Sequence, residues 1–143
     1  MNSGNSTAFV DTNVLISGIF FDGLEAELLD SRSIHLVTAE VCHDELEEVA
    51  VRKSGTFGIS EQGAVEALDT ALIDIDIIPE EEYEDRYGEA VDVLGEGNDA
   101  KVFASVLEAK PDYFVTGDKD FHTDTVAEKV NVVRTREVLE EID

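Results

Sequence analysis

The chain has little of what membrane proteins, disulfide-rich proteins and zinc-thiolate proteins need. Cys42 is the one cysteine, which excludes an internal disulfide and a cysteine-rich zinc site. The longest apolar run, residues 14–21, contains Ser17 and Gly18 and is far shorter than the ~20 residues of a membrane-spanning helix. Residues 1–7 lack the positive charge and the apolar segment of a signal peptide. We therefore expect a flexible lead-in at residues 1–7 and a cytoplasmic protein.

Positive charge is also scarce. The 143 residues include 10 Lys and Arg against 34 Asp and Glu, which gives a net charge of -24. The acids are spread along the chain, a pattern that favours a halophilic host, such as a halophilic archaeon, because molar salt screens self-repulsion. Taken alone, the charge argues against binding a phosphate backbone. With 43% hydrophobic residues, the chain can bury one core, so we expect a single domain over residues 1–143.

Short apolar segments alternate with helical patterns along the chain, and their order predicts the fold class. The apolar segments predict strands at residues 8–10, 34–38, 73–78 and 113–115. The helical patterns cover residues 13–21, 24–29, 39–53, 60–72, 80–94 and 99–109, and a last helix, strand and helix cover 123–142. This alternation predicts an α/β fold, a three-layer sandwich in which helices flank a central parallel sheet of four to five strands.

Carboxylates follow two of the expected strands. Asp11 comes directly after residues 8–10, and Asp118 and Asp120 come shortly after residues 113–115. Ligands of open parallel sheets bind outside the carboxyl ends of the strands, so these acids are candidates for a functional site. Each could instead cap the helix that follows it, which is the commoner role for a single Asp at such a position.

Two further acids fall on the apolar faces of expected helices. At ~100° per residue, Glu45 projects between Val41 and Val49, and Asp99 lies at the centre of the apolar stripe of its helix. A buried carboxylate without a partner is costly, so each needs a cation or a shifted pKa. Carboxylates without His or Cys select Mg²⁺ or Mn²⁺, and the waters of such sites can be activated to attack a phosphodiester.

Four motifs together resemble the PIN domain family in their order and spacing. They are residues 10–17 (VDTNVLIS), Glu45 on a helix, residues 98–100 (NDA) and residues 115–121 (VTGDKDF). The resemblance covers nearly the whole chain. It implies a parallel sheet flanked by helices and a Mg²⁺- or Mn²⁺-dependent endoribonuclease that hydrolyses RNA phosphodiester bonds. In that family such an enzyme is often the toxin of a VapC-type toxin-antitoxin pair.

The same resemblance implies a role for each matching residue. The catalytic and metal-binding residues would be an acidic quartet, with Asp11 and Asp99 holding the principal metal and Glu45 and Asp118 positioning or deprotonating the attacking water. The supporting residues would be Asn13, Thr116 and Asp120.

The resemblance also implies partners for the chain. They would be an RNA substrate, an antitoxin protein and a second copy of the chain in a homodimer. Leu24 and Leu28, as exposed apolar residues on the early helices, are candidates for the dimer contact.

Two other interpretations stay open. A catalytically inactive PIN-like module would bind an antitoxin peptide or another protein and keep a metal for structure alone, although intact acids at all four positions count against it. A phosphatase or phosphate receiver would use Asp11 as a phosphorylated nucleophile. Haloacid-dehalogenase-like phosphatases need a second Asp where Asn13 stands, and the Lys-Pro pair of receivers follows a late strand, whereas Lys110 and Pro111 precede one.

Histidine and aromatic residues point to no further chemistry. The spacing of the three histidines matches no zinc motif, so we expect them in surface or core positions. We expect Cys42 to be a small core residue. The aromatic residues that could stack on bases are expected in the core instead. These histidine and aromatic residues are His35, His43, His122, Phe57, Tyr83 and Tyr87.

Overall fold

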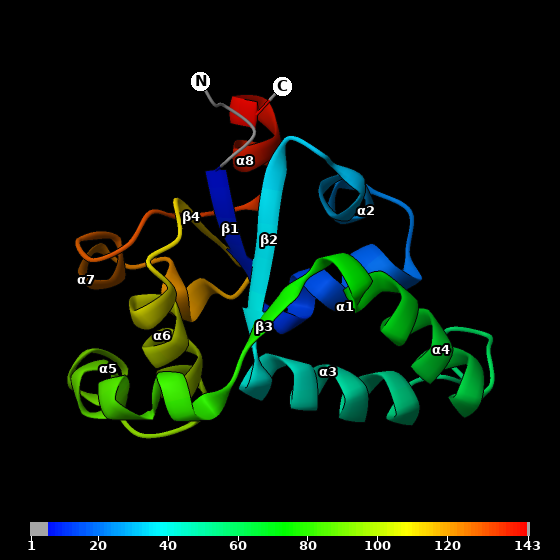
Figure 1. The fold of residues 1–143 in the computed structure, drawn as a ribbon, viewed down its shortest axis with the longest axis horizontal. Helices are drawn as coiled ribbons and strands as arrows, with labels where there is room; N and C mark the ends of the chain where they lie inside the picture. Colours follow the sequence, from blue (N-terminus) through cyan, green and yellow to red (C-terminus); the bar gives the residue numbers. More distant parts are fainter. Residues whose placement is uncertain (1–5, 143) are drawn as a thin grey trace.

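The computed structural model describes residues 6–142 and contains a five-stranded sheet in the order β3-β2-β1-β4-β5 (Figure 1). All four strand pairings are parallel, and Ala8 in the central strand pairs with Leu36 on one side and Tyr113 on the other. The strands are β1 (Ser6–Val10), β2 (Ile34–Ala39), β3 (Asp76–Ile78), β4 (Tyr113–Val115) and β5 (Val132–Val133). The predicted α/β class and parallel sheet are confirmed.

Helices connect the strands and cover both faces of the sheet (Figure 1). No helix within residues 6–142 is long and apolar enough to cross a membrane. The α-helices are α1 (Thr12–Phe20), α2 (Leu24–Asp30), α3 (Glu40–Arg52), α4 (Glu61–Ala71), α5 (Tyr87–Leu94), α6 (Asn98–Ala109), α7 (Asp124–Ala127) and α8 (Thr135–Ile142). Short 3-10 turns are η1 (Leu72–Asp74), η2 (Glu80–Glu82), η3 (Glu84–Arg86) and η4 (Lys119–Phe121).

The central strand shows how one apolar run fills two cores. Side chains alternate along a strand, so Ala8 and Val10 join the core beneath α1, α4 and α8, whereas Phe9 joins the core beneath α5, α6 and α7. All three side chains are fully buried. A strand buried on both faces is a continuous apolar run, as parallel sheets require, and the three-layer sandwich follows from it.

The third strand is shorter than the isoleucine pattern predicts. Residues 73–78 were expected to be extended, but Ile73 lies in the 3-10 turn η1 and is 76% exposed. The strand β3 begins at Asp76 and ends at Ile78, directly before Pro79. The alternating isoleucines alone could not show where η1 ends and β3 begins. An edge strand is little buried, so its apolar residues need not follow a strict alternating pattern.

The predicted helix over residues 80–94 is wrong in its first half. Two 3-10 turns, η2 and η3, occupy residues 80–86 and the α-helix α5 starts at Tyr87. The cause is Tyr83, a core side chain whose hydroxyl accepts a hydrogen bond of 3.1 Å from the backbone N–H of Val41. Tyr83 thereby satisfies an N–H at the start of α3, which the helix cannot satisfy itself.

Two expectations about the early chain also differ from the structure. Leu28 was expected to be exposed for dimer contact, but it is fully buried because α2 turns it towards the core between α1 and the sheet; Leu24 is 36% exposed. The lead-in was expected to cover residues 1–7, whereas β1 begins at Ser6. Residues 1–5 of that expectation lie outside the described residues.

The two ends of the sheet have different surroundings. Helix α8 lies beside the amino end, where the hydroxyl of Tyr113 donates a 3.1 Å hydrogen bond to the carboxylate of Glu141 (Figure 1). At the carboxyl end, β1 and β4 are neighbours although the chain leaves them towards helices that join different cores. Such a switch point is where open parallel sheets bind ligands, and Asp11 and Asp118 follow the two strands there.

Candidate metal centre

Asp11 is the buried acid of the carboxyl edge. It follows β1 directly and is 5% exposed. Its Oδ1 accepts a 2.8 Å hydrogen bond from the N–H of Thr12, so it caps α1. Its Oδ2 accepts a 2.7 Å hydrogen bond from the hydroxyl of Thr116, which follows β4. The side chain therefore caps a helix and also links the two central strands, so the capping role and a functional role do not exclude each other.

Thr116 organises the turn after β4. Its side chain is fully buried, and its hydroxyl oxygen accepts a 3.0 Å hydrogen bond from the N–H of Asp118 while it donates to Asp11. The backbone carbonyl of Thr116 lies 2.8 Å from Nε2 of His122, which donates to it in the Nε2–H tautomer. These contacts fix the direction in which the acids of this turn project.

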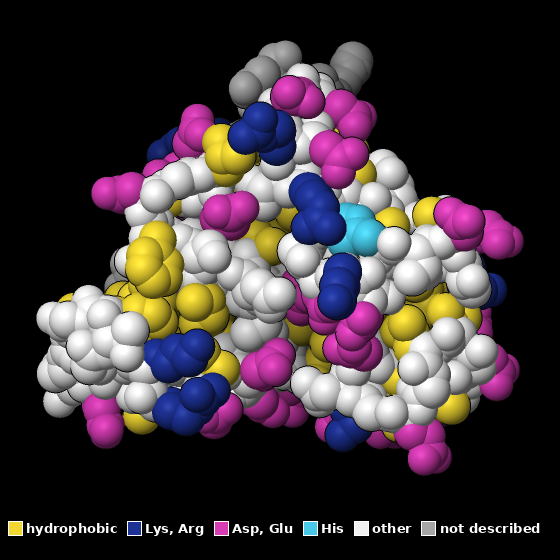
Figure 2. Space-filling view, turned by 180° about the vertical axis from the view of Figure 1, so that it is seen from behind, with side chains coloured by type: hydrophobic (Ala, Val, Ile, Leu, Met, Phe, Trp, Pro, Cys, Tyr) yellow, Lys and Arg dark blue, Asp and Glu magenta, His cyan; other side chains and the backbone are white. Residues whose placement is uncertain are grey.

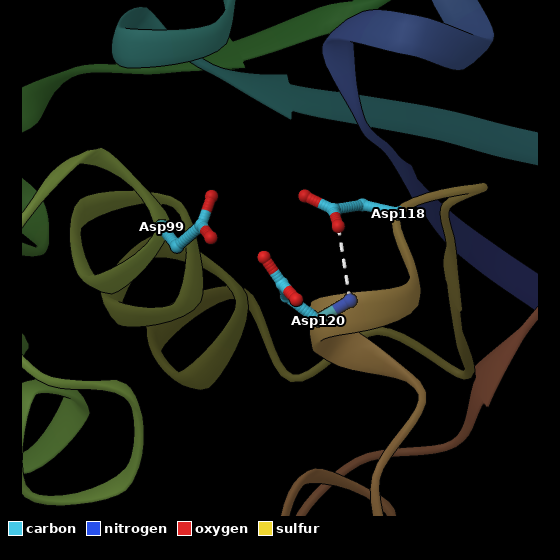
Figure 3. Close-up of side chains that lie close together, drawn as sticks. All are labelled: Asp99, Asp118 and Asp120. Atoms are coloured by element: carbon cyan, nitrogen blue, oxygen red, sulfur yellow. Dashed lines mark hydrogen bonds between the residues drawn. The ribbon is translucent and has the colours of Figure 1, made fainter.

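Three carboxylates meet in front of this turn. Figure 3 shows Asp99 projecting from α6 towards Asp118 and Asp120, which come from the turn around η4. One oxygen of each lies within 4.8 Å of the other two. The N–H of Asp120 donates a 2.9 Å hydrogen bond to Asp118, which closes the turn. Asp99 and Asp118 are half-buried and Asp120 is exposed. We call Asp99, Asp118 and Asp120 the acidic triad.

Asp99 owes its place to the start of α6. The helix begins after Gly97, whose φ of 139° lies in the region that favours glycine. The N–H of Gly97 donates a 3.2 Å hydrogen bond to the hydroxyl of Tyr87. Partial burial raises the pKa of Asp99, and the negative charges of Asp118, Asp120 and Glu45 raise it further.

Glu45 occupies a different environment from the one its sequence position predicts. The helical pattern placed it on the core face of α3, but it is exposed, and Cys42, Leu46 and Ala50 form the buried stripe. Helix α3 lies beyond the carboxyl end of β2 and not over a face of the sheet (Figure 1), so a narrow stripe is covered and the neighbouring arc stays open to solvent. Glu45 still acts on the acids electrostatically, since its charge raises the pKa of both Asp11 and Asp99.

Burial raises the pKa of Asp11 to about 6, against an ordinary value of 3.8. The hydrogen bonds from Thr116 and Thr12 act in the opposite direction, and the charges of Glu45 and Asp118 raise the pKa further. The dominant cause is the loss of water around a charged group. A positive ion close to Asp11 would reverse this balance and favour the ionised form.

The donor set fits a hard divalent cation. Glu45 and Asp118 act electrostatically on both Asp11 and Asp99, and Asp120 acts on Asp99. Among residues 6–142 none of these five carboxylates forms an ion pair with Lys or Arg. Like charges at such distances repel one another. Oxygen ligands without sulfur or imidazole suit Mg²⁺, Mn²⁺ or Ca²⁺. The triad and Asp11 are therefore the groups in this structure that could hold such an ion.

Comparison with known families gives the chain an identity. The family model described as PIN domain matches residues 9–142. The chain belongs to the PIN domain family. The match includes Asp11, Glu45, Asp99 and Asp118, so the resemblance seen in the sequence motifs is confirmed at the level of the family. A search of curated protein sequences finds no significant match to this PIN domain.

Solved structures similar to this PIN domain include toxin-antitoxin proteins. VapBC2 from Rickettsia felis, bound to a promoter DNA fragment, matches with TM-score 0.70 and 17% identity over 90% of this chain and 98% of that chain. A toxin-antitoxin complex from Klebsiella pneumoniae matches with TM-score 0.64 and 21% identity over 90% and 97%. VapC20 from Mycobacterium tuberculosis, a sarcin-ricin loop cleaving toxin, matches with TM-score 0.62 and 22% identity over 89% and 98%. At these identities the likeness is one of fold.

Asn13, a predicted supporting residue, is exposed in the first turn of α1, and no hydrogen bond joins it to Asp11 in the described part of the PIN domain. Two other features of this edge were not recognised from sequence. The contact of His122 with Thr116 was missed, because a lone histidine gives no signal of its partner. Arg134 and Arg136 follow β5 at the same edge. A strand that ends in two nearby arginines is a signal that could have been used.

Proposed function

We propose that this protein is a divalent-metal-dependent endoribonuclease that hydrolyses RNA phosphodiester bonds with Mg²⁺ or Mn²⁺. The observation that carries the proposal is the acidic triad, whose oxygens lie within 4.8 Å of one another at the carboxyl edge of the sheet. Membership of the PIN domain family supports it. A strongly acidic chain can act on RNA when a metal ion provides the positive charge that the substrate phosphate needs.

The triad provides the direct ligands in this proposal. Asp99 and Asp118 are half-buried, so their oxygens are partly shielded from water, and Asp120 completes the group from the exposed side. A metal ion bound there supplies a Lewis acid and a water that is more easily deprotonated. The hydrogen bond from Asp120 N–H to Asp118 keeps two of the ligands in one rigid turn, which lowers the entropy lost on binding.

Asp11 and Glu45 are the two members of the predicted quartet that lie outside the triad. In this proposal Asp11 supports metal binding and Glu45 acts in catalysis. Asp11 is connected to Asp118 of the triad through Thr116, whose hydroxyl holds Oδ2 of Asp11 in one orientation through the 2.7 Å hydrogen bond. Its negative charge strengthens the attraction for a cation. Glu45 is exposed and within electrostatic reach of Asp11 and Asp99, so its carboxylate can accept the proton of the attacking water. Asn13 is exposed beside them and is available to hydrogen-bond to substrate or water.

The similar structures support a more specific biological role. One of them is a sarcin-ricin loop cleaving toxin, and others are toxin-antitoxin complexes. We infer that this chain acts as the toxin of such a pair and cleaves a structured RNA. The inference rests on similarity of fold together with the acids at all four positions of the quartet.

Cleavage of labelled structured RNA by the purified protein tests the nuclease proposal. The reaction is run with Mn²⁺, with Mg²⁺ and with EDTA, in a KCl series up to molar concentrations, and circular dichroism confirms folding at each point. We expect metal-dependent cleavage that Asp99→Asn abolishes. Asp69→Asn, on the exposed face of α4, is the matched control and should cleave like the wild type.

The inactive interaction module is the alternative outcome of this experiment. Folded protein that binds Mn²⁺ but cuts neither RNA nor single-stranded DNA under any of these conditions would contradict the nuclease proposal. The retained metal would then serve structure alone. Phosphate transfer to Asp11 is tested in the same samples with acetyl phosphate, and covalent labelling of Asp11 would favour the phosphatase or receiver interpretation instead.

Partner binding is a second proposal, favoured by the complexes among the similar structures. We propose an antitoxin partner and a homodimer. For the homodimer, the exposed apolar side chains of Phe21 and Leu24, which are 55% and 36% exposed, are the candidate contacts in place of Leu28. Sedimentation velocity of the wild type should show a dimer, and a double variant with Phe21→Ser and Leu24→Ser should sediment as a monomer.

A further inference from the structure

The carboxyl edge of the sheet holds positive charge as well as the acids. The whole chain has 10 Lys and Arg residues. Arg134 comes directly after the last residue of β5, and Arg136 lies in the first turn of α8. Because β4 and β5 are parallel neighbours, with Val115 paired to Val133, Arg134 follows β5 at the level where Thr116 follows β4. Figure 2 shows basic side chains and a histidine beside acidic side chains near the middle of one face of the molecule.

The side chain of Arg134 is hydrogen-bonded to the turn that carries Asp118 and Asp120. Nη1 of Arg134 donates a 3.3 Å hydrogen bond to the backbone carbonyl of Gly117, the residue between Thr116 and Asp118. The N–H of Thr116 in turn donates to the carbonyl of Val133, at 3.1 Å. The guanidinium group therefore lies next to the turn that carries two members of the acidic triad.

A cavity of about 260 Å³ opens beside this guanidinium group. Helices α1 and α2 form one side of it, and the turns after β4 and β5 form the other. The polar lining includes the two arginines, Asn13, Ser17 and Glu25. Glu25 is the one carboxylate among the lining residues, in contrast to the strongly acidic surface elsewhere. We call this cavity the arginine pocket.

The two arginines of the pocket keep their charge available. Two other arginines of the chain are paired: Arg52 with Glu48 at 2.6 Å and Arg86 with Glu108 at 3.1 Å. Within residues 6–142, neither Arg134 nor Arg136 forms an ion pair with a carboxylate. Guanidinium groups bind phosphate oxygens through paired, charge-assisted hydrogen bonds. An anion with several oxygen atoms is the ligand that this lining suits.

We propose that the arginine pocket binds a phosphate group of the RNA strand, next to the phosphodiester at the acidic triad. The inference rests on the proposed nuclease function and names the residues that position its substrate. Arg134 and Arg136 would hold the phosphate oxygens, and Asn13 and Ser17 offer further hydrogen bonds from α1. Without such a contact the carboxylates would repel the strand on both sides of the metal, because each nucleotide carries a negative charge.

Anisotropy of a short fluorescein-labelled single-stranded RNA, with and without Mn²⁺, tests the pocket. The variants are Arg136→Gln, Glu25→Gln and, as a matched control, Arg52→Gln. Among the described residues the side chain of Arg136 forms no hydrogen bond to the rest of the chain, so its replacement leaves the turn intact. We expect Arg136→Gln to weaken binding by about tenfold or more. Glu25→Gln should strengthen binding, and Arg52→Gln should leave it unchanged.

Salt dependence separates a phosphate contact from a structural effect. Loss of one phosphate contact lowers the slope of log Kd against log[KCl] by about 0.7 for a single strand, so Arg136→Gln should show this decrease. Arg136→Gln should weaken binding of a DNA strand of equal sequence by the same factor as binding of the RNA, because the backbone phosphate is common to both. Unchanged affinity and slope in Arg136→Gln, no RNA binding by the wild type, or a loss confined to RNA would each overturn the proposal.

The two proposals fail in different ways. If Arg136→Gln still cleaves RNA and its RNA affinity is unchanged, the pocket proposal is contradicted and the nuclease proposal stands. If the wild type does not cleave RNA but its RNA binding depends on Arg136, the nuclease proposal is contradicted and a nucleic-acid-binding pocket remains. In the cleavage reaction, Arg136→Gln should raise KM with little change in kcat, because Arg136 acts on the strand and not on the reacting atoms.

Discussion

The hydroxyl of Thr116 donates a 2.7 Å hydrogen bond to Oδ2 of Asp11, although the two residues are 105 positions apart in the sequence. Both follow strands of the sheet, β1 and β4, that are parallel neighbours at the switch point. The bond orients the buried acid and, through the N–H of Asp118, which donates to the same hydroxyl oxygen, connects it to the acidic triad. Thr116 is thus a positioning residue for both groups.

Replacement of Thr116 by Val should uncouple the two groups. The hydroxyl is lost while the shape is kept, so the N–H of Asp118 loses its acceptor and Oδ2 of Asp11 loses its donor. We expect Mn²⁺ affinity to fall about 10- to 100-fold, as for other residues that orient metal ligands. Isothermal titration calorimetry measures this. Thr116→Ser keeps the hydroxyl and is the control; equal Mn²⁺ affinity in the Val variant and the wild type would contradict the prediction.

The raised pKa of Asp11 predicts how stability depends on pH. In the metal-free protein its pKa is about 6, against about 3.9 in an unfolded chain. Between these values the native state binds more protons than the unfolded state, so the free energy of unfolding decreases as pH rises. For this group alone the loss reaches about 3 kcal/mol above pH 6.

Urea denaturation at pH 5 and pH 7 measures this effect. The metal-free wild type should be more stable at pH 5, and saturating Mn²⁺ should shrink or reverse the difference, since a cation favours ionised Asp11. Asp11→Asn, which carries no titrating group at this position, should show a smaller change between the two pH values. A wild type that gains stability on going from pH 5 to pH 7 without metal would show that another group dominates.

Metal binding should stabilise the protein through the triad and only weakly through Glu45. At a Mn²⁺ concentration 100 times the dissociation constant, the gain in the free energy of unfolding is about 2.7 kcal/mol. We expect this gain in the wild type and in Glu45→Gln, because Glu45 is exposed and outside the triad. It should be lost in Asp99→Asn and Asp118→Asn. Thermal unfolding with Mn²⁺ and with EDTA measures it; an equal loss in Glu45→Gln would make Glu45 a direct ligand.

Tyr83 offers a prediction about stability alone. Replacing it with Phe keeps the buried ring but removes the oxygen that accepts from the N–H of Val41. An unsatisfied buried donor costs about 1–3 kcal/mol, and this N–H is partly buried, so Tyr83→Phe should lower the free energy of unfolding by an amount at the lower end of that range. Tyr113→Phe, which removes a more exposed hydroxyl bound to Glu141, should cost less. Equal urea midpoints for Tyr83→Phe and the wild type would contradict this account.

The sequence allowed the acids at strand ends to be found, because parallel strands bring their carboxyl ends to one edge. Asp11 and Asp118 were recognised in this way, and residues 8–10 and 113–115 are strands in the structure. The burial of Glu45 was predicted wrongly, since the position of a residue around a helix does not tell how wide a face its neighbours cover. Leu28 was misjudged for the same reason.

Contacts that depend on the packing of distant segments were beyond the sequence. The 3-10 turns at residues 80–86 place Tyr83 in contact with α3, and no local sequence pattern predicts that contact. The arginine pocket likewise forms because the first residues after β5 lie beside those after β4. The order of strands in the sheet, which the sequence leaves undetermined, decides both which acids meet and which arginines accompany them.

The contact between Tyr113 and Glu141 at the amino end of the sheet has a practical consequence. Residue 6, where β1 starts, and residue 142, where α8 ends, both lie at this end, opposite the acids (Figure 1). A biotin attached beyond either residue would therefore anchor the protein by the amino end of its sheet, away from the site. Immobilised in this orientation, the molecule would present its acidic edge and the arginine pocket to a flowing nucleic acid, so surface-based kinetics could be measured without blocking the site.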